Sequence, residues 1–139
     1  MLNVSKVDLW SGQIENRPGG LLARLEPLVK AGADLDFLAG RAVGDEHGGV
    51  IIMSPITGQR QQMVAEELGL RRNEKLFCLR LEGPDEPGFG YRILFAMASE
   101  KLNVQEVSAS TLGGQFVMYV AFGNAEDADQ AANRLRRPL

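Results

Sequence analysis

The sequence contains little cysteine and histidine, few aromatic residues and no long apolar run. Its 139 residues include one cysteine, Cys78, and one histidine, His47. A single cysteine excludes an internal disulfide framework. A single histidine excludes a metal site built from several histidines. No apolar run approaches the ~20 residues that a helix needs to span a bilayer, and the N-terminus has no basic-then-apolar signal sequence. These absences lead us to expect a soluble, cytoplasmic protein with no membrane contact.

The sequence also lacks a strong charge of either sign. Fifteen basic and 18 acidic side chains give a net charge of −3. Such a chain has no long-range attraction for nucleic acid or anionic lipid, so we expect no nucleic-acid partner. With 45% hydrophobic and 24% charged residues, the composition is that of a folded globular protein, and the length suits one ordinary domain or two very small ones.

Glycine, in contrast, is abundant, and its placement indicates an internal repeat. The chain has 16 glycines, and several follow proline or another glycine. A shift of the sequence by 69 positions places Pro18-Gly19 on Pro87-Gly88. Apolar positions of the next helix also coincide, because residues 22, 25, 28 and 29 fall on residues 91, 94, 97 and 98. We therefore predict two repeats, residues 1–69 and 70–139.

The residue pattern of each repeat predicts the element order βαββα. The expected strands are residues 6–14, 34–43 and 50–54 in the first repeat, and 76–81, 103–111 and 115–122 in the second. A Pro-Gly loop and a helix with one apolar face follow each first strand, and a second helix closes each repeat. Gly32 is the expected stop of the first helix. Pro27 predicts a kink or a late start in that helix, and Asn124 is the expected N-cap of the last one.

A ferredoxin-like repeat needs a fourth strand after its second helix. The source of this strand is undetermined in the prediction, because the second repeat ends too soon to supply one. We hypothesise an exchange in which residues 76–81 complete the first repeat and the N-terminal strand completes the second. The predicted fold class is therefore α+β. It consists of two ferredoxin-like repeats that share one six-stranded, antiparallel-type sheet, with four helices on one face.

The segment from Glu15 to Ala23, followed by residues 31–35, resembles the ACT domain family. The resemblance covers nearly the whole chain as two tandem copies and implies small regulatory modules, many of which bind amino acids where two domains meet. It implies a non-catalytic regulatory protein that forms a homodimer, acts on a regulated protein partner and needs no cofactor or metal. No catalytic domain is attached, which departs from the enzymes that usually carry the module.

The loop chemistry agrees with a ligand site. A Pro-Gly loop that opens a helix exposes backbone N–H groups at the positive end of the helix dipole, where a carboxylate binds. Asn16 and Arg17 would hold the carboxylate, and Asn103 or Asp34 would meet the ammonium. The predicted ligand-binding residues are Asn16, Arg17, Pro18, Gly19, Gly20, Leu21, Asp34, Leu35, Asp85, Pro87, Gly88, Asn103 and Val104.

The two loops are not equivalent. The first carries the positive Arg17, whereas the second carries the negative pair Asp85-Glu86, which repels a ligand carboxylate. Phe89 also fills space where the first loop has Gly20. We therefore expect the first loop to be the better carboxylate site.

Three other functions remain open. Residues 76–81 and 113–119 resemble the strand motifs of the RNA-recognition motif, whose aromatic residues stack on bases, but the second repeat is neutral and lacks the basic residue that opens the motif. An interaction module without a small ligand is the second alternative. An enzyme is disfavoured, because the carboxylates follow no catalytic motif and the tip at Asp45-Glu46-His47 offers too few ligands for a dedicated metal site. Cys78 and Trp10 are expected in the core.

Overall fold

The chain forms two compact units, and its N-terminal strand belongs to the unit that is otherwise built from residues 74–139. The computed structural model describes residues 2–44 and 48–139. Unit 1 consists of residues 1–7 and 74–139, and unit 2 consists of residues 8–73. These bounds differ from the repeat division at residues 69 and 70, because the N-terminal strand pairs within unit 1. Among the described residues, no helix has both the length and the apolar character needed to cross a membrane.

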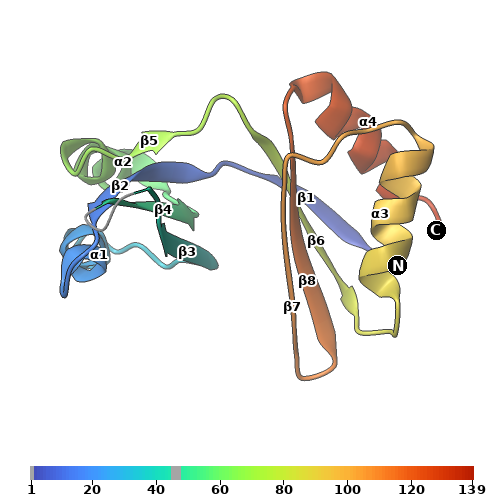
Figure 1. The fold of residues 1–139 in the computed structure, drawn as a ribbon, viewed down its shortest axis with the longest axis horizontal. Helices are drawn as coiled ribbons and strands as arrows, with labels where there is room; N and C mark the ends of the chain where they lie inside the picture. Colours follow the sequence, from blue (N-terminus) through green and yellow to red (C-terminus); the bar gives the residue numbers. More distant parts are fainter. Residues whose placement is uncertain (1, 45–47) are drawn as a thin grey trace. The chain divides into compact units, whose positions relative to one another are not determined.

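Unit 2 is a four-stranded antiparallel sheet with two helices on one face (Figure 1). Its strand order is β3-β4-β2-β5. The elements are β2 (Trp10–Glu15), α1 (Gly20–Lys30), β3 (Phe37–Ala42), β4 (Gly48–Ser54), α2 (Gly58–Glu67) and β5 (Arg71–Arg72). Its core contains Trp10, Leu28, Ile51, Met53 and Leu70, so Trp10 is a core residue as predicted.

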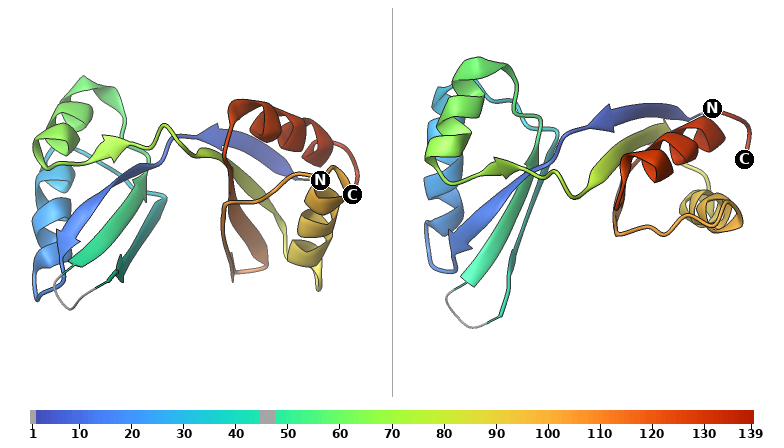
Figure 2. Two further views of the ribbon diagram at one scale, coloured as in Figure 1. Left: turned by 45° about the horizontal axis from the view of Figure 1, so that its top comes forward. Right: turned by 90° about the horizontal axis from the view of Figure 1, so that it is seen from above.

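Unit 1 repeats this architecture with the strand order β1-β6-β8-β7 (Figure 2). The elements are β1 (Asn3–Val7), β6 (Phe77–Pro84), α3 (Phe89–Ser99), β7 (Glu106–Leu112), β8 (Gln115–Phe122) and α4 (Ala125–Leu135). Alternate residues of β6 and β8 face α3 and α4 and form the core, together with Leu2. Cys78 is buried, and this burial raises the pKa of its thiol to about 12, so the residue is inert as expected.

The structure confirms the α+β class and the ferredoxin-like repeats, but the single six-stranded sheet is wrong. The predicted strand 6–14 divides at Asp8-Leu9 into β1, which pairs with β6, and β2, which pairs with β4 and β5. The N-terminal strand therefore does complete the second repeat. The reverse exchange is wrong, because β5 completes unit 2 while β6 stays within unit 1.

The ends of the helices follow their sequence signals. Helix α1 runs through Pro27, so the late start is wrong; the carbonyl that loses its partner belongs to the exposed Ala23 and can bind water. Gly32 ends α1 with φ 87°, and the hydrogen bonds Gly32 N to Val29 O and Ala33 N to Leu28 O form a Schellman motif. Asn124 caps α4 by accepting a hydrogen bond from Asp127 N at 2.8 Å, as predicted.

The entry and exit of unit 2 are joined by a backbone hydrogen bond. Asn73 N donates to Leu9 O at 2.7 Å, next to the pairing of β2 with β5. The chain therefore leaves unit 2 beside the point where it entered.

Candidate functional site

A cavity of about 360 Å³ lies in unit 2 at the end of the sheet where α1 begins. It is bounded by the end of β2, the loop that follows, the first turn of α1, the end of β3 and the start of β4. This volume lies in the range of small-ligand pockets. The described residues that line it are Ile14, Glu15, Asn16, Arg17, Gly19, Leu21, Leu22, Gly40, Arg41, Ala42 and Gly49.

The polar part of the cavity combines both signs of charge. Arg17 and Glu15 form an ion pair through Nε and Oε2. Arg41 of β3 also lines the cavity, but its pairing with Val50 directs its side chain to the sheet face opposite that of Gly40. The hydrogen bond from Arg17, and then its charge, lower the pKa of Glu15 below the ordinary glutamate value. Glu15 therefore stays ionised to a more acid pH than a glutamate in solution, and the site presents a carboxylate beside the Arg17 guanidinium.

The start of α1 adds backbone donors to the cavity. Gly19 is the N-cap residue with φ 84°, and within the described part of the chain no side chain caps the helix or places an acidic group in its first turn. The first N–H groups of a helix lack partners inside it. The start of α1 is therefore suited to an anionic group, with the Leu21 and Leu22 side chains as an apolar wall beside it.

Glycines in the strands make room for this cavity. A Cβ atom on Gly49 would lie 2.8 Å from Ile14 Cγ1, and a Cβ atom on Gly40 would lie 3.1 Å from Leu21 Cδ2. Both glycines line the cavity. A larger side chain at either position would therefore displace Ile14 or Leu21, which also line the cavity.

Four of the residues predicted in the first loop line this cavity, namely Asn16, Arg17, Gly19 and Leu21. Pro18 and Gly20 do not line it. Gly20 is buried, and a Cβ atom there would lie 2.1 Å from Glu15 O. The glycine is required because the turn brings its α-carbon against that carbonyl, and this is a role in shaping the loop.

Asp34 and Leu35 lie at the opposite end of the sheet from this loop. Strand β3 runs in the same direction as β2, because both are antiparallel to β4. Residues 34 and 35 precede β3 at the Trp10 end, a strand length of roughly 17 Å from Glu15. Leu35 packs on the core of unit 2. Within unit 2, therefore, one ligand does not contact both segments.

The second loop is arranged differently. Asp85, Pro87 and Gly88 are exposed, and Asn103 and Val104 precede β7 at the far end of the sheet. Val104 packs on the core of unit 1. Glu86 pairs with Arg92 at 2.6 Å, and the buried Phe89 ring packs 5.1 Å from that of Phe116. The position equivalent to Gly20 thus carries a buried aromatic ring in the second loop.

Sequence reasoning missed Arg41 and Glu15 as residues of the site. Glu15 stands two positions before Arg17, which is the spacing of the observed ion pair. Arg41 requires the strand register, because only the pairing of β3 with β4 brings it to the end of β2.

Two other expectations concern metal and RNA. Among residues 2–44 and 48–139, no group of three or more His, Cys, Asp or Glu side chains could hold a metal ion. Asp45, Glu46 and His47 lie outside the described residues. Phe116 belongs to the helix-side core of unit 1, so the aromatic side chain expected to stack on a base is covered by helices.

Solved structures with the same fold include chains of aspartate kinase and a further bacterial protein. A Bacteroides thetaiotaomicron protein superposes with a TM-score of 0.78 and 15% identity, over 96% of this chain and 88% of the other. The regulatory subunit of aspartate kinase from Thermus thermophilus superposes with a TM-score of 0.67 and 14% identity, over 97% and 94% of the two chains.

A third similar structure belongs to a larger enzyme. Aspartokinase III of Escherichia coli, solved with lysine and aspartate, gives a TM-score of 0.58 and 15% identity, over 97% of this chain and 32% of the enzyme. No protein-family model matches the chain, and no curated protein sequence matches it. The comparisons show that the chain has the tandem ACT-like fold of these regulatory regions, as expected from its loop motif.

Proposed function

We propose that the protein is a non-catalytic regulatory module that binds a free amino acid in the cavity of unit 2. The observation that carries the proposal is the set of groups gathered there: the Arg17 guanidinium, the ionised Glu15 carboxylate, the Asn16 side chain and the start of α1. An amino acid offers a carboxylate and an ammonium group within one small molecule, and this set is complementary to both.

The ligand would be held by its charged end at the loop. Its carboxylate would accept hydrogen bonds from Arg17 and from the first N–H groups of α1, because charge-assisted hydrogen bonds are the stronger kind. Its ammonium group would lie against Glu15, and its side chain would contact Leu21 and Leu22. The site lies close to β3, which is an edge strand of its sheet. Ligand binding would therefore alter the association of this edge strand with another protein chain.

The regulatory part of the proposal is supported by the shared fold. Neighbours of this fold include a separate regulatory subunit of a kinase. We therefore propose a cytoplasmic homodimer that reports amino-acid binding to a regulated protein partner. Such allosteric control requires that the ligand prefer one arrangement of the protein over another.

The first test is thermal unfolding in the presence of each standard amino acid, followed by calorimetry. A ligand specific for the folded state stabilises it by about 2.7 kcal/mol at a hundredfold excess over Kd. We expect one amino acid or one chemical class to raise the Tm. Replacement of Gly40 by valine should abolish the shift by filling the cavity, whereas Ala39→Val, on the adjacent position of the same strand, should preserve it.

A second candidate function is an interaction module without a small ligand. It is favoured by large apolar side chains that are more than half exposed on two helices: Leu22 and Val29 on α1, and Tyr91 and Phe95 on α3. Exposed apolar clusters often mark protein interfaces. No Tm shift with any amino acid, together with a stable dimer in analytical ultracentrifugation that Val29→Glu dissociates, would favour this function over the first.

A further inference from the structure

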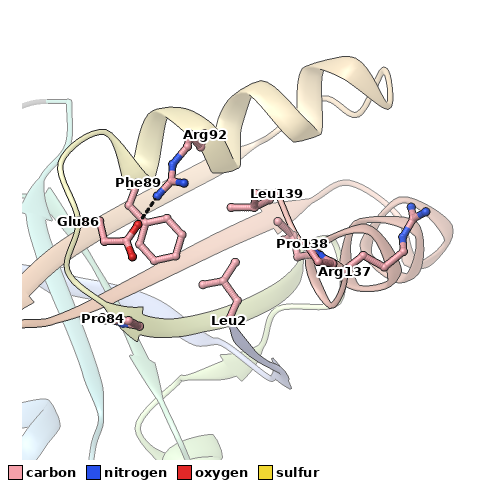
Figure 3. A pocket seen from close by; sticks show the side chains of 9 residues that line it. Leu2, Pro84, Glu86, Phe89, Arg92, Arg137, Pro138 and Leu139 are labelled. Atoms are coloured by element: carbon pink, nitrogen blue, oxygen red, sulfur yellow. Dashed lines mark hydrogen bonds and ion pairs between the residues drawn. The ribbon is translucent and has the colours of Figure 1, made fainter.

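Unit 1 contains a second cavity, of about 320 Å³, that differs in place and chemistry from the one in unit 2. It lies where the start of α3, the end of α4 and the chain after α4 come together (Figure 3). None of its lining residues is a predicted ligand-binding residue, although a shift of 69 positions places Pro84 and Glu86 on Glu15 and Arg17 of the unit 2 cavity.

The wall of this cavity is mostly apolar. Leu2, Phe89 and Leu135 are buried and come from three segments that are far apart in the sequence. Pro138 and Leu139 close another side. Figure 3 shows Leu2, Phe89 and Leu139 directed toward the same space. The cavity therefore suits a small apolar body, such as an aromatic ring or a branched alkyl group.

A fixed guanidinium stands at the rim of this apolar space. Arg92 donates from Nη2 to Glu86 Oε2 at 2.6 Å, and its Cζ atom lies 5.2 Å from the centroid of the Phe89 ring. These two contacts hold the guanidinium above the ring. A guanidinium carries five N–H donors, and the bond to Glu86 engages one nitrogen, so a second carboxylate has donors within reach.

The charged side chains of the lining belong to three residues. Two arginines, Arg92 and Arg137, accompany the carboxylate side chain of Glu86. The guanidinium of Arg137 points away from the cavity in Figure 3, which leaves Arg92 as the anchor. Helix α3 also begins here at Phe89, and within the described ranges no side chain caps it. Among the lining side chains, Glu86 is the acceptor for an ammonium group and is paired with Arg92, whereas the cavity of unit 2 adds the Asn16 amide to its paired carboxylate.

We propose that this cavity binds a small apolar monocarboxylate without an amino group, with its carboxylate on Arg92 and its apolar body between Leu2, Phe89 and Leu139. The site is independent of the amino-acid site of unit 2. The protein would then respond to two chemically different ligands, one zwitterionic and one a simple carboxylic acid.

The test uses the full chain and two probes of one shape, phenylacetate and phenylacetamide, which differ in charge. Calorimetry should show that phenylacetate binds about tenfold more tightly than phenylacetamide. The reason is that Arg92 bonds to a charged carboxylate in the first probe and to a neutral amide in the second. In ¹⁵N-labelled protein, the amide shifts should fall in residues 84–92 and 135–139. Equal affinities, no binding of either probe, or shifts confined to residues 14–22 would overturn the proposal.

Substitutions test the charge of the proposed anchor, Arg92, separately from the shape of the cavity. Arg92→Met should reduce phenylacetate binding to the level of the amide, whereas Arg136→Met, which removes an exposed arginine outside the lining, should leave it unchanged. Glu86→Gln should tighten phenylacetate binding because it removes the competing carboxylate. An Arg92→Met protein that bound phenylacetate as well as the unmodified chain would refute the assignment of the anchor.

The shape of the cavity is tested by filling it. Leu139→Trp should weaken both probes, while Leu112→Trp, which adds the same side chain at the exposed tip between β7 and β8, should weaken neither. Gly40→Val should leave both affinities intact. Loss of phenylacetate binding in Gly40→Val would place the probe in unit 2 and contradict the proposal, independently of whether an amino acid binds there.

Discussion

Gly20 and Phe89 occupy equivalent positions in the two repeats, and this one difference separates the two loops. At Gly20 the chain passes so close to the Glu15 carbonyl that there is no space for a Cβ atom. At Phe89 the loop is wider, and the aromatic ring fills the space beneath it. The cavity of unit 2 lies beside the first loop, at the end of the sheet. The cavity of unit 1 lies beside the second loop, next to α3 and α4.

The tight loop predicts a large effect of a small substitution. Gly20→Ala should destabilise unit 2 by about 2–3 kcal/mol, because the added Cβ atom meets a backbone oxygen that cannot move without the loop. Gly19→Ala is the matched control: its Cβ atom meets open space, and only the positive φ costs energy, about 1 kcal/mol. Urea unfolding measures both variants. A Gly20→Ala variant no less stable than Gly19→Ala would show that the close approach is absent.

At the scale of single residues, the sequence identified the loop but not the complete site. Asn16, Arg17, Gly19 and Leu21 were found because the Pro-Gly motif marks them directly. Arg41 was not found, because its place at the cavity depends on pairing between strands. The segment at Asp34 was joined to the loop by resemblance, although it lies at the other end of the same sheet.

At the scale of elements, the two repeats end their first helix with the same geometry but different residues. Gly32 and Lys101 are 69 positions apart, and both have positive φ, 87° and 62°. The Schellman bond of α1 has its counterpart in Leu102 N to Met97 O at 2.9 Å. Glycine adopts this conformation at no steric cost, whereas lysine is strained by its Cβ atom.

This comparison predicts a stabilising substitution in unit 1. Lys101→Gly should raise the free energy of unfolding of unit 1 by about 1 kcal/mol, because it relieves a left-handed conformation in a non-glycine residue. Lys101→Ala is the control for loss of the lysine charge and should give no such gain. Thermal unfolding followed by circular dichroism measures both. A gain of equal size in the alanine variant would assign the effect to charge.

The helices and their stops were predictable because their signals are local. The strands were less so. The stretch 6–14 reads as one strand because its pattern is continuous, and its division between two sheets at Asp8-Leu9 depends on distant partners. Strand β5 has only two residues, which are too few for an alternation of polar and apolar side chains to be recognised. The predicted exchange of the N-terminal strand was correct, since it followed from counting the strands each repeat requires.

At the scale of the whole molecule, the two units have separate cores, although one chain crosses between them twice. Residue 2 packs in the core of unit 1, which otherwise consists of residues after 74. Leu70 is fully buried in the core of unit 2. The fragment 1–69 would therefore lack a core residue of unit 2 and carry a strand of unit 1.

Substitutions in these two residues should act on one unit each. Leu2→Ala should destabilise unit 1 by about 2 kcal/mol, the low end for a buried leucine, because the residue lies at the edge of the core. Native-state hydrogen exchange should show faster exchange in β6 and β8 and unchanged exchange in β2 and β4. Leu70→Ala should give the reverse pattern. Uniform acceleration through the whole chain in either variant would show that the units unfold together.

The hydrogen bond between Leu9 and Asn73 has a consequence for the order of folding. Strand β1 must find β6 across a separation of 79 residues at the pair Asn3 and Glu82, and closing so long a loop is entropically costly. Once unit 2 has folded, its entry and exit are held side by side, and the loop to be closed shrinks to a few residues. The saving is about 2 kcal/mol of loop-closure entropy. During synthesis unit 2 leaves the ribosome before β6, on the order of seconds earlier. Folding of unit 2 thus brings together β1 and β6, the strand pair with the largest sequence separation, as the two arms of a local hairpin.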